Sequence, residues 1–356
     1  MFPIFLSDFS TFFGFVFRNV QTKNLCILID FPATHYNEIS EKMNTVIRKY
    51  CNVSLERYLV IAYGSSSISS QLLYFCGVSF MKIAAFYENI LEGAEKLGIT
   101  DREALITLYN QGMRAIYISC DSLCSDKERL LSLFREIGLE VEGLHGFFDL
   151  GIDPESDGCM DMIRLAKDAG ASNVLIVPGM ISPEDENQRE ARLQNMQTAL
   201  SKAVAYGEQE GIVVSMEDFD GLDAPYNSAK GLKWFLDHVP GLMCTFDTGN
   251  FIMFHEDEME AFHLFRDRIC ALHIKDRAAT PISDADRPKQ CADGSFVYPA
   301  PVGSGYIKIR EILASLVQDG YPGNVIAELY DYDDMLNGVI QSVSWLNATL
   351  RELGGA

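Results

Sequence analysis

Short apolar runs alternate with longer amphipathic segments from residue 81 to the end of the chain. The short runs have the length of buried strands, and the longer segments carry apolar residues at helical spacing. We predict eight strands, over residues 82–87, 114–119, 139–144, 173–177, 212–216, 242–246, 270–274 and 325–329. We predict helices over 102–111, 126–137, 159–169, 183–210, 229–238, 257–268, 307–317 and 334–352.

Residues that favour helix ends support these boundaries. Thr100 is a predicted N-cap, and Gly112, Gly138 and Gly211 each follow a predicted helix. Residues 277–306 contain many Pro, Asp and Gly residues, and we predict that they form one long loop.

Regular alternation of strands and helices is typical of parallel β/α units. The 276 residues from Met81 to Ala356 are close to the ~250 of an eight-fold barrel. We therefore predict an α/β fold, a (β/α)8 TIM barrel over residues 81–356. An open, doubly wound sheet is the alternative, but it rarely uses eight equal units.

Residues 1–80 differ from the rest of the chain in composition. They hold ten of the 22 phenylalanines but only 11 of the 79 Lys, Arg, Asp and Glu residues. The start carries neither the early positive charge nor the cleavage site of a secretory signal. Gly and Ser interrupt residues 58–80, whereas a membrane span needs about 20 nearly continuous apolar residues. We interpret 1–80 as a loosely packed N-terminal extension, either an upstream extension of the reading frame or a real accessory domain.

The charge of the chain limits its partners. A net charge of −21 argues against nucleic acid, which requires a basic face, and against an anionic membrane surface. The nine cysteines are odd in number and show no C-x-x-C spacing. This pattern favours a reducing cytoplasm over a disulfide framework, so we predict a cytoplasmic protein. Formation of a homo-oligomer is left open.

Four side chains that bind metals well stand at the ends of neighbouring predicted strands. Glu217, Asp247, His273 and Glu328 end strands five to eight. A single carboxylate at a strand end is more often a cap or a surface charge. In a barrel, however, the C-terminal ends of all strands share one face, so four adjacent ends meet at one point. Three carboxylates and one imidazole suit one divalent ion, with Mn²⁺ favoured and Mg²⁺, Co²⁺ or Zn²⁺ as alternatives.

These stretches resemble those of the xylose isomerase-like barrels, a family that includes sugar isomerases and epimerases, inosose dehydratases and apurinic-site endonucleases. The resemblance covers about residues 82–354 and rests on 215–218, 246–250, 272–276 and 327–329, with the Gly-rich segment 301–305. It implies that Glu217, Asp247, His273 and Glu328 bind one divalent metal. It also implies that Glu217 and Glu328 act as catalytic acid and base.

The chain departs from parts of the family pattern. Asn250 stands where the endonucleases and ketose epimerases have a histidine, and residues 277–306 contain no histidine. A three-metal cluster of the endonuclease type therefore lacks ligands, which argues against DNA repair. Ala279 stands where ketose epimerases often have an arginine, and Arg277 or Lys275 is a candidate substitute.

The leading hypothesis is a metal-dependent sugar or polyol isomerase or epimerase, which moves a proton through an enediolate. We expect Lys275, Asn250, Arg277 and Glu88 to contact the small carbohydrate substrate, and His145 to act in catalysis. One alternative is a metal-dependent lyase or dehydratase, of the inosose dehydratase or C-glycoside-cleaving type, in which His145 is the base. Another is a sugar-binding barrel without turnover, although a pure binder needs no opposed acid and base.

Overall fold

The computed structural model describes residues 16–19, 24–30, 58–63, 72–76 and 81–354. The chain divides into two units, Met1–Phe80 and Met81–Ala356. In the first unit, β1 (Val16–Asn19), β2 (Asn24–Asp30), β3 (Tyr58–Tyr63) and β4 (Leu72–Cys76) form a sheet in that order. The Gly- and Ser-rich stretch 64–70 lies outside the described residues. The interpretation of 1–80 as an extension stays a prediction.

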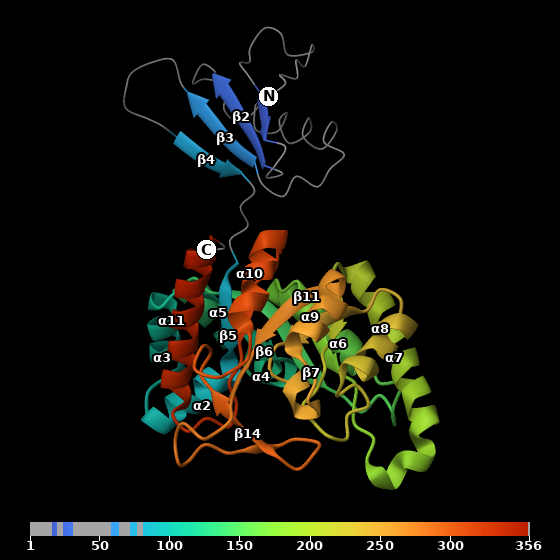
Figure 1. The fold of residues 1–356 in the computed structure, drawn as a ribbon. Helices are drawn as coiled ribbons and strands as arrows, with labels where there is room; N and C mark the ends of the chain where they lie inside the picture. Colours follow the sequence, from blue (N-terminus) through green and yellow to red (C-terminus); the bar gives the residue numbers. More distant parts are fainter. Residues whose placement is uncertain (1–15, 20–23, 31–57, 64–71, 77–80, 355–356) are drawn as a thin grey trace. The chain divides into compact units, whose positions relative to one another are not determined.

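The second unit is a closed barrel of eight parallel strands in the order β10-β11-β15-β5-β6-β7-β8-β9. Figure 1 shows the strands β5, β6 and β7 among the helices of the unit. Its strands are β5 (Ile83–Phe86), β6 (Met113–Ser119), β7 (Glu140–Phe147), β8 (Asn173–Val177), β9 (Val213–Met216), β10 (Met243–Asp247), β11 (Ile269–Ile274) and β15 (Val325–Ala327). The last strand pairs with the first, Ile326 opposite Ala84, which closes the barrel. The predicted TIM barrel is confirmed.

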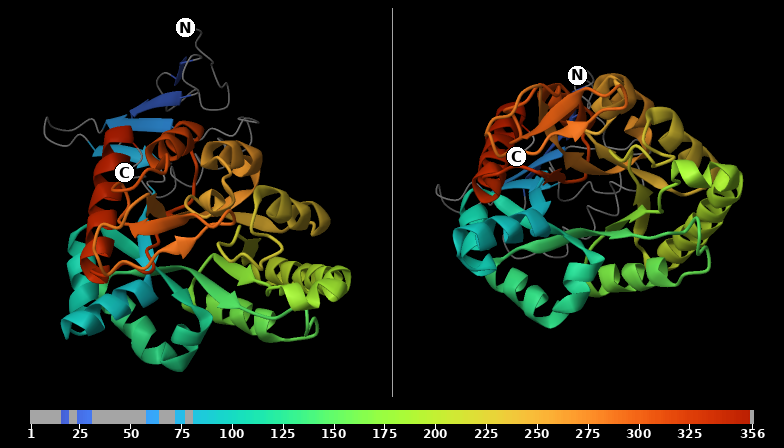
Figure 2. Two further views of the ribbon diagram at one scale, coloured as in Figure 1. Left: turned by 60° about the horizontal axis from the view of Figure 1, so that its bottom comes forward. Right: turned by 90° about the horizontal axis from the view of Figure 1, so that it is seen from below.

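Helices surround the strands, as the right-hand view of Figure 2 shows. They are α2 (Tyr87–Leu97), α3 (Asp101–Asn110), α4 (Cys120–Ser125), α5 (Lys127–Ile137), α6 (Gly158–Ala169), α7 (Arg189–Glu210), α8 (Ala229–His238), α9 (Glu258–Phe265), α10 (Ile309–Asp319) and α11 (Met335–Leu353). The short 3-10 helices of this unit are η2 (Pro183–Gln188), η3 (Phe251–Phe254) and η4 (Arg266–Arg268). Residues 183–188, which were predicted as the start of one long helix, therefore form a separate 3-10 helix before α7.

Local chemistry explains where several helices begin and end. The Thr100 side chain accepts from the Glu103 amide, and the Glu103 side chain accepts from the Thr100 amide, which forms a complete capping box. Gly138 and Gly211 end α5 and α7 in the left-handed conformation that glycine adopts without steric cost.

Helices α2 and α4 were not predicted. Gly93 lies among the buried residues of α2, where an added Cβ would lie 2.5 Å from the Leu336 amide nitrogen of α11. The glycine thus lets two helices approach closely while it weakens the local helix signal. Helix α4 has only six residues, with the Ser119 hydroxyl accepting from the Ser122 amide at its start.

The prediction of a structureless loop over 277–306 was wrong. Three strands, β12 (Asp276–Ala278), β13 (Lys289–Gln290) and β14 (Phe296–Ala300), form an antiparallel sheet in the order β12-β14-β13. The buried Asp286 carboxylate accepts from the amides of Ile282, Ser283 and Asp333, which ties this insertion to the segment after β15. Polar contacts of this kind leave no apolar periodicity in the sequence.

The described residues of this unit bury three apolar clusters, of which the smallest consists of Met253, Cys291 and Val297. The largest one lies between the strands and the surrounding helices. The remaining cluster packs separately from it and consists of Ala84, Phe86, Ala115, Tyr117, Leu175, Ala271 and Ile326. In the described part of the chain, no helix is long and apolar enough to span a membrane.

We predict that a chain beginning at Met81 folds as the full-length protein does, because β5 finds both of its partners, β6 and β15, within residues 81–356. Circular dichroism should show native secondary structure and cooperative thermal unfolding. A control that begins at Asn89 lacks β5, leaves the barrel open and should be insoluble. An insoluble chain from Met81 would refute the prediction.

A candidate metal centre at one end of the barrel

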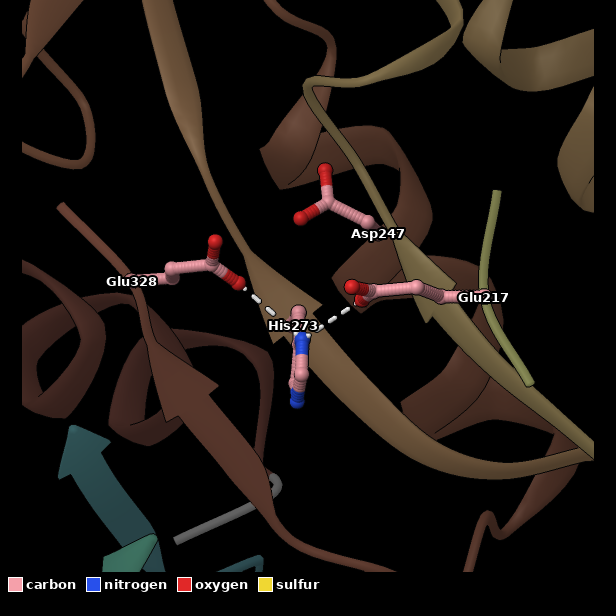
Figure 3. Close-up of side chains that lie close together, drawn as sticks. All are labelled: Glu217, Asp247, His273 and Glu328. Carbon is pink, nitrogen blue, oxygen red and sulfur yellow. Dashed lines mark ion pairs between the residues drawn. The ribbon is translucent and has the colours of Figure 1, made fainter. Parts of the chain in front are cut away.

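Four potential ligands converge at the C-terminal end of four adjacent strands (Figure 3). Glu217 follows β9, Asp247 ends β10, His273 lies in β11 and Glu328 follows β15. One ligand atom from each lies within 4.8 Å of the other three. We call these four residues the cage. The structure brings them together as the sequence analysis expected, and their metal-binding role stays a prediction.

Strand register and backbone contacts hold the cage residues level with one another. Asp247 pairs with His273 across β10 and β11, and the Glu328 amide donates to the carbonyl of Ile274 at 3.0 Å. The Thr248 hydroxyl accepts from the Lys275 amide and donates to the Lys275 carbonyl. These contacts fix the ends of β10 and β11 relative to each other, so Asp247 and His273 lie at the same level along the barrel axis.

The cage contains polar atoms that fit a bound cation. Glu217 Oε2, Asp247 Oδ2, His273 Nδ1 and Glu328 Oε2 are buried and have no hydrogen-bond partner among the described residues. His273 Nδ1 lies 2.9 Å from Glu217 Oε2 and 3.0 Å from Glu328 Oε2, at ion-pair distance (Figure 3). Unsatisfied buried polar atoms are rare and costly. One divalent ion would satisfy all four at once.

Burial and crowding of like charge shift the acidity of the cage. Burial, reinforced by Glu328 and Glu217, raises the pKa of Asp247 to about 7, and burial also raises the pKa of Glu217. Burial acts to lower the pKa of His273, but Glu217 and Glu328 outweigh it and raise that pKa to about 9. Without a cation, protons therefore offset part of the negative charge.

Lys275 provides a second positive charge beside the cage. Its Nζ lies 2.6 Å from Glu328 Oε1 and 3.1 Å from Asp247 Oδ2, and it donates to Asn250 Oδ1 at 2.9 Å. Burial acts to raise the pKa of Glu328, but Lys275 and His273 hold it below the ordinary range of a glutamic acid. Of the predicted substrate residues, Lys275 and Asn250 thus lie directly beside the cage.

Arg277 lies one contact further out. Its guanidinium donates to Asp220 Oδ2 at 2.9 Å and to the Gly249 carbonyl at 3.3 Å, and its side chain is buried. Lys289 of β13 contacts the other oxygen of Asp220, and Lys275 Nζ lies 4.0 Å from the same carboxylate. Asp220 was not predicted from the sequence, because it follows β9 in an irregular segment that belongs to no motif.

His145 and Glu88 occupy the other side of the barrel. His145 was expected to end strand three, but β7 continues to Phe147, so the histidine is an internal strand residue. Its ring stacks on Tyr117 at 5.6 Å. Burial lowers the pKa of His145, which favours the neutral imidazole. Glu88 Oε1 accepts from the Ser119 amide at 3.0 Å.

Two further buried atoms remain unsatisfied on this side. Among the described residues, Glu88 Oε2 and His145 Nδ1 have no hydrogen-bond partner. Both are therefore available to a ligand, although the roles proposed for these two residues stay predictions.

Comparison with known proteins supplies a family and a fold. Residues 110–349 match the family model described as xylose isomerase-like TIM barrel. "Putative L-ribulose-5-phosphate 3-epimerase SgbU" of Escherichia coli strain K12 is 27% identical over 198 residues, which cover 54% of this chain and 64% of that relative. The chain thus matches less than two thirds of this curated relative's length.

Solved structures show the same fold at low identity. The probable 3-DHS dehydratase AsbF from Bacillus anthracis is 15% identical with a TM-score of 0.58, and the match covers 75% of this chain and 99% of that one. The IOLI protein, solved with a zinc atom, is 17% identical with a TM-score of 0.58 over 77% and 98% of the two chains.

We predict that the affinity of the cage for Mn²⁺ rises with pH. Asp247 (pKa about 7) and His273 (pKa about 9) must lose their protons before they can bind a metal. Both hold protons at pH 6, so the slope of log affinity against pH should be about two there, and it should approach one near pH 8. Isothermal titration in buffers of different ionisation enthalpy measures the protons released.

His273→Ala should weaken Mn²⁺ binding and reduce the release by about one proton. An affinity that does not change between pH 6 and 8 would contradict the assignment of these two residues as ligands.

Proposed function

Because the chain belongs to the xylose isomerase-like TIM barrel family, we propose that it is a divalent-metal-dependent isomerase or epimerase of a small carbohydrate. The observation that carries the proposal is the convergence of the four cage side chains, each with at least one buried atom that has no hydrogen-bond partner among the described residues. The relative SgbU, named as a sugar-phosphate epimerase, supports the reaction class. Since the match covers only part of that protein, the activity and the substrate are part of the proposal.

Glu217, Asp247, His273 and Glu328 would hold the ion. When bound, the ion would polarise neighbouring hydroxyl and carbonyl oxygens of the substrate and so acidify the C–H bond between them. Mn²⁺ suits three carboxylates and one imidazole. Zn²⁺, Mg²⁺ and Co²⁺ are the alternatives, and the zinc atom in the related IOLI structure supports Zn²⁺ among them.

The two glutamates are arranged for proton transfer. They approach His273 Nδ1 from opposite sides and come from β9 and β15, which two other strands separate (Figure 3). A substrate carbon held between them would have a carboxyl group on each face. Lys275 and His273 lower the pKa of Glu328, a direction that suits a base, whereas burial raises the pKa of Glu217, a direction that suits an acid.

Neighbouring side chains would position the substrate. Lys275 Nζ lies against Glu328 and would stabilise negative charge that develops on a substrate oxygen. Asn250 accepts from Lys275 and donates to the Asp218 carbonyl, which fixes the lysine. Asp220 and Gly249 hold Arg277 rigidly, so any contact with the substrate would use a preorganised guanidinium.

A metal-dependent lyase or dehydratase is the second candidate. The buried, neutral His145 with its unsatisfied Nδ1 supports it, since such a group can remove a proton next to a leaving group. A sugar-binding barrel without turnover is the third, and the opposed glutamates argue against it. A cytoplasmic location and the absence of nucleic-acid or membrane partners stay predictions, and the formation of a homo-oligomer stays open.

We predict that Glu328→Gln lowers turnover by about 10²–10⁴-fold even at saturating Mn²⁺, because an amide cannot accept a proton. The corresponding barrier increase is about 3 kcal/mol or more. Glu217→Gln should behave in the same way. The assay is conversion of a sugar panel, with solvent deuterium incorporation measured by NMR.

Glu258→Gln is the matched control, since Glu258 is a buried glutamate that contacts Lys308 rather than the cage. Its turnover should stay near that of the unmodified protein. Full rescue of both cage variants by excess Mn²⁺ would refute the two-glutamate mechanism. The lyase would be favoured by a different set of results. Excess Mn²⁺ would rescue both cage variants, His145→Ala would lose turnover, and the product would be one formed by elimination.

A further inference from the structure

The barrel has two chemically different halves at its C-terminal end. Strands β9, β10, β11 and β15 supply the cage, and β5, β6 and β7 supply Phe86, Tyr117 and His145. Phe86 and Tyr117 rings lie 4.9 and 4.8 Å from the His273 ring, so the aromatic half borders the cage directly.

A row of aromatic rings continues from there toward solvent. Phe86 contacts Tyr330 at 5.9 Å and His145 at 5.2 Å, His145 contacts Phe147 at 6.2 Å, and Phe147 contacts Phe219 at 5.8 Å. We call these five residues the aromatic arc. It joins the segments after β15 and β9 through β5 and β7.

Phe147 is the most exposed ring of the arc. It is 63% exposed, and Tyr330 is 38% exposed. Phe147 lies two residues after His145 in the same strand, so both side chains point to the inside of the barrel. A single exposed apolar residue is ordinary. An exposed ring above the buried histidine, in contact with further rings, instead offers a flat surface to a molecule that reaches the cage.

Unsatisfied polar atoms accompany the rings. Glu88 Oε2 and His145 Nδ1 are buried, and within the described residues neither has a hydrogen-bond partner. Rings that stack on a flat face, beside groups that bind hydroxyls, match the two kinds of surface of a sugar ring.

The cations near the cage argue against a charged substrate group. Lys275, Arg277 and Lys289 each lie within 4.0 Å of a carboxylate, and Asp220 contacts all three. A phosphate would have to displace these contacts inside a buried network, which is costly.

We propose that the aromatic arc is a binding subsite for an uncharged glycoside that carries a flat, aromatic aglycone and, on its sugar ring, a ketone next to a hydroxyl, the two oxygens that the proposed reaction requires. The sugar ring lies over the cage with hydroxyls at Glu88 and His145, and the aglycone stacks on Phe147 and Phe219. This inference names a substrate class for the proposed isomerase or lyase and therefore rests on the proposed function. Its test depends on stacking, so it can fail independently of metal chemistry.

The test compares phenyl and methyl β-D-glucopyranoside in isothermal titrations with the full-length protein. The phenyl glycoside should bind about two- to tenfold more tightly, the value of one aromatic contact. Phe147→Ala should bring the two affinities to within about twofold, and Phe147→Tyr should keep the difference. Ile106→Ala on α3, which removes another exposed apolar side chain, should also keep it.

Three results would each overturn the proposal. The unmodified protein could bind the two glycosides with equal affinity, it could bind neither, or Phe147→Ala could leave the ratio of the two affinities unchanged. Tighter binding of D-ribulose 5-phosphate than of both glycosides would also overturn it. Repeating the titrations with EDTA separates the two proposals. The phenyl glycoside could still bind more tightly than the methyl glycoside in EDTA, with added Mn²⁺ changing neither affinity. That result would support the subsite and count against metal-dependent catalysis.

Discussion

Crowding of buried negative charge is the constraint on which the site depends. Glu217, Asp247 and Glu328 lie around His273 with one ligand atom each within 4.8 Å, and all four side chains are buried. Carboxylates removed from water repel one another strongly unless a positive charge lies between them. Lys275 and bound protons provide part of that charge, as the raised pKa values of Asp247 and His273 indicate. A divalent ion would provide it more completely, and its binding would release those protons.

The same constraint explains the surrounding architecture. Parallel strands carry the acidic side chains to one end of the barrel, and the contacts of Thr248 with Lys275 keep two of those strand ends aligned. Asp220 anchors Arg277 and Lys289 outside the cage, so the insertion that contains β13 is attached to the segment after β9. With charge concentrated in one half of the barrel, the other half is left to aromatic rings, His145 and Glu88. A substrate would therefore meet a cation on one side and a stacking surface on the other.

Much of the fold could be predicted from the sequence because barrel strands are continuous apolar runs. Strand β8 and helix α8 match their predicted ranges, and the cage follows from which strand ends are adjacent. Features held by single long-range contacts were missed. Gly93 lowers the helix propensity of α2, but its role is the close approach to Leu336, which no local pattern reveals. The sheet of β12 to β14 depends on polar contacts such as those of Asp286, and Asp220 contacts three cations from distant segments. The aromatic arc likewise joins residues from separate strands and has no local pattern.

The central claim is that the cage binds one divalent ion, and anomalous X-ray diffraction from crystals grown with Mn²⁺ tests it most directly. The account predicts one strong anomalous peak about 2.0–2.6 Å from Glu217, Asp247, His273 Nδ1 and Glu328. It also predicts that this peak is weaker in His273→Ala crystals grown at the same Mn²⁺ concentration. A map without a peak between these four side chains, with Lys275 still bound to Glu328 and Asp247, would contradict the account.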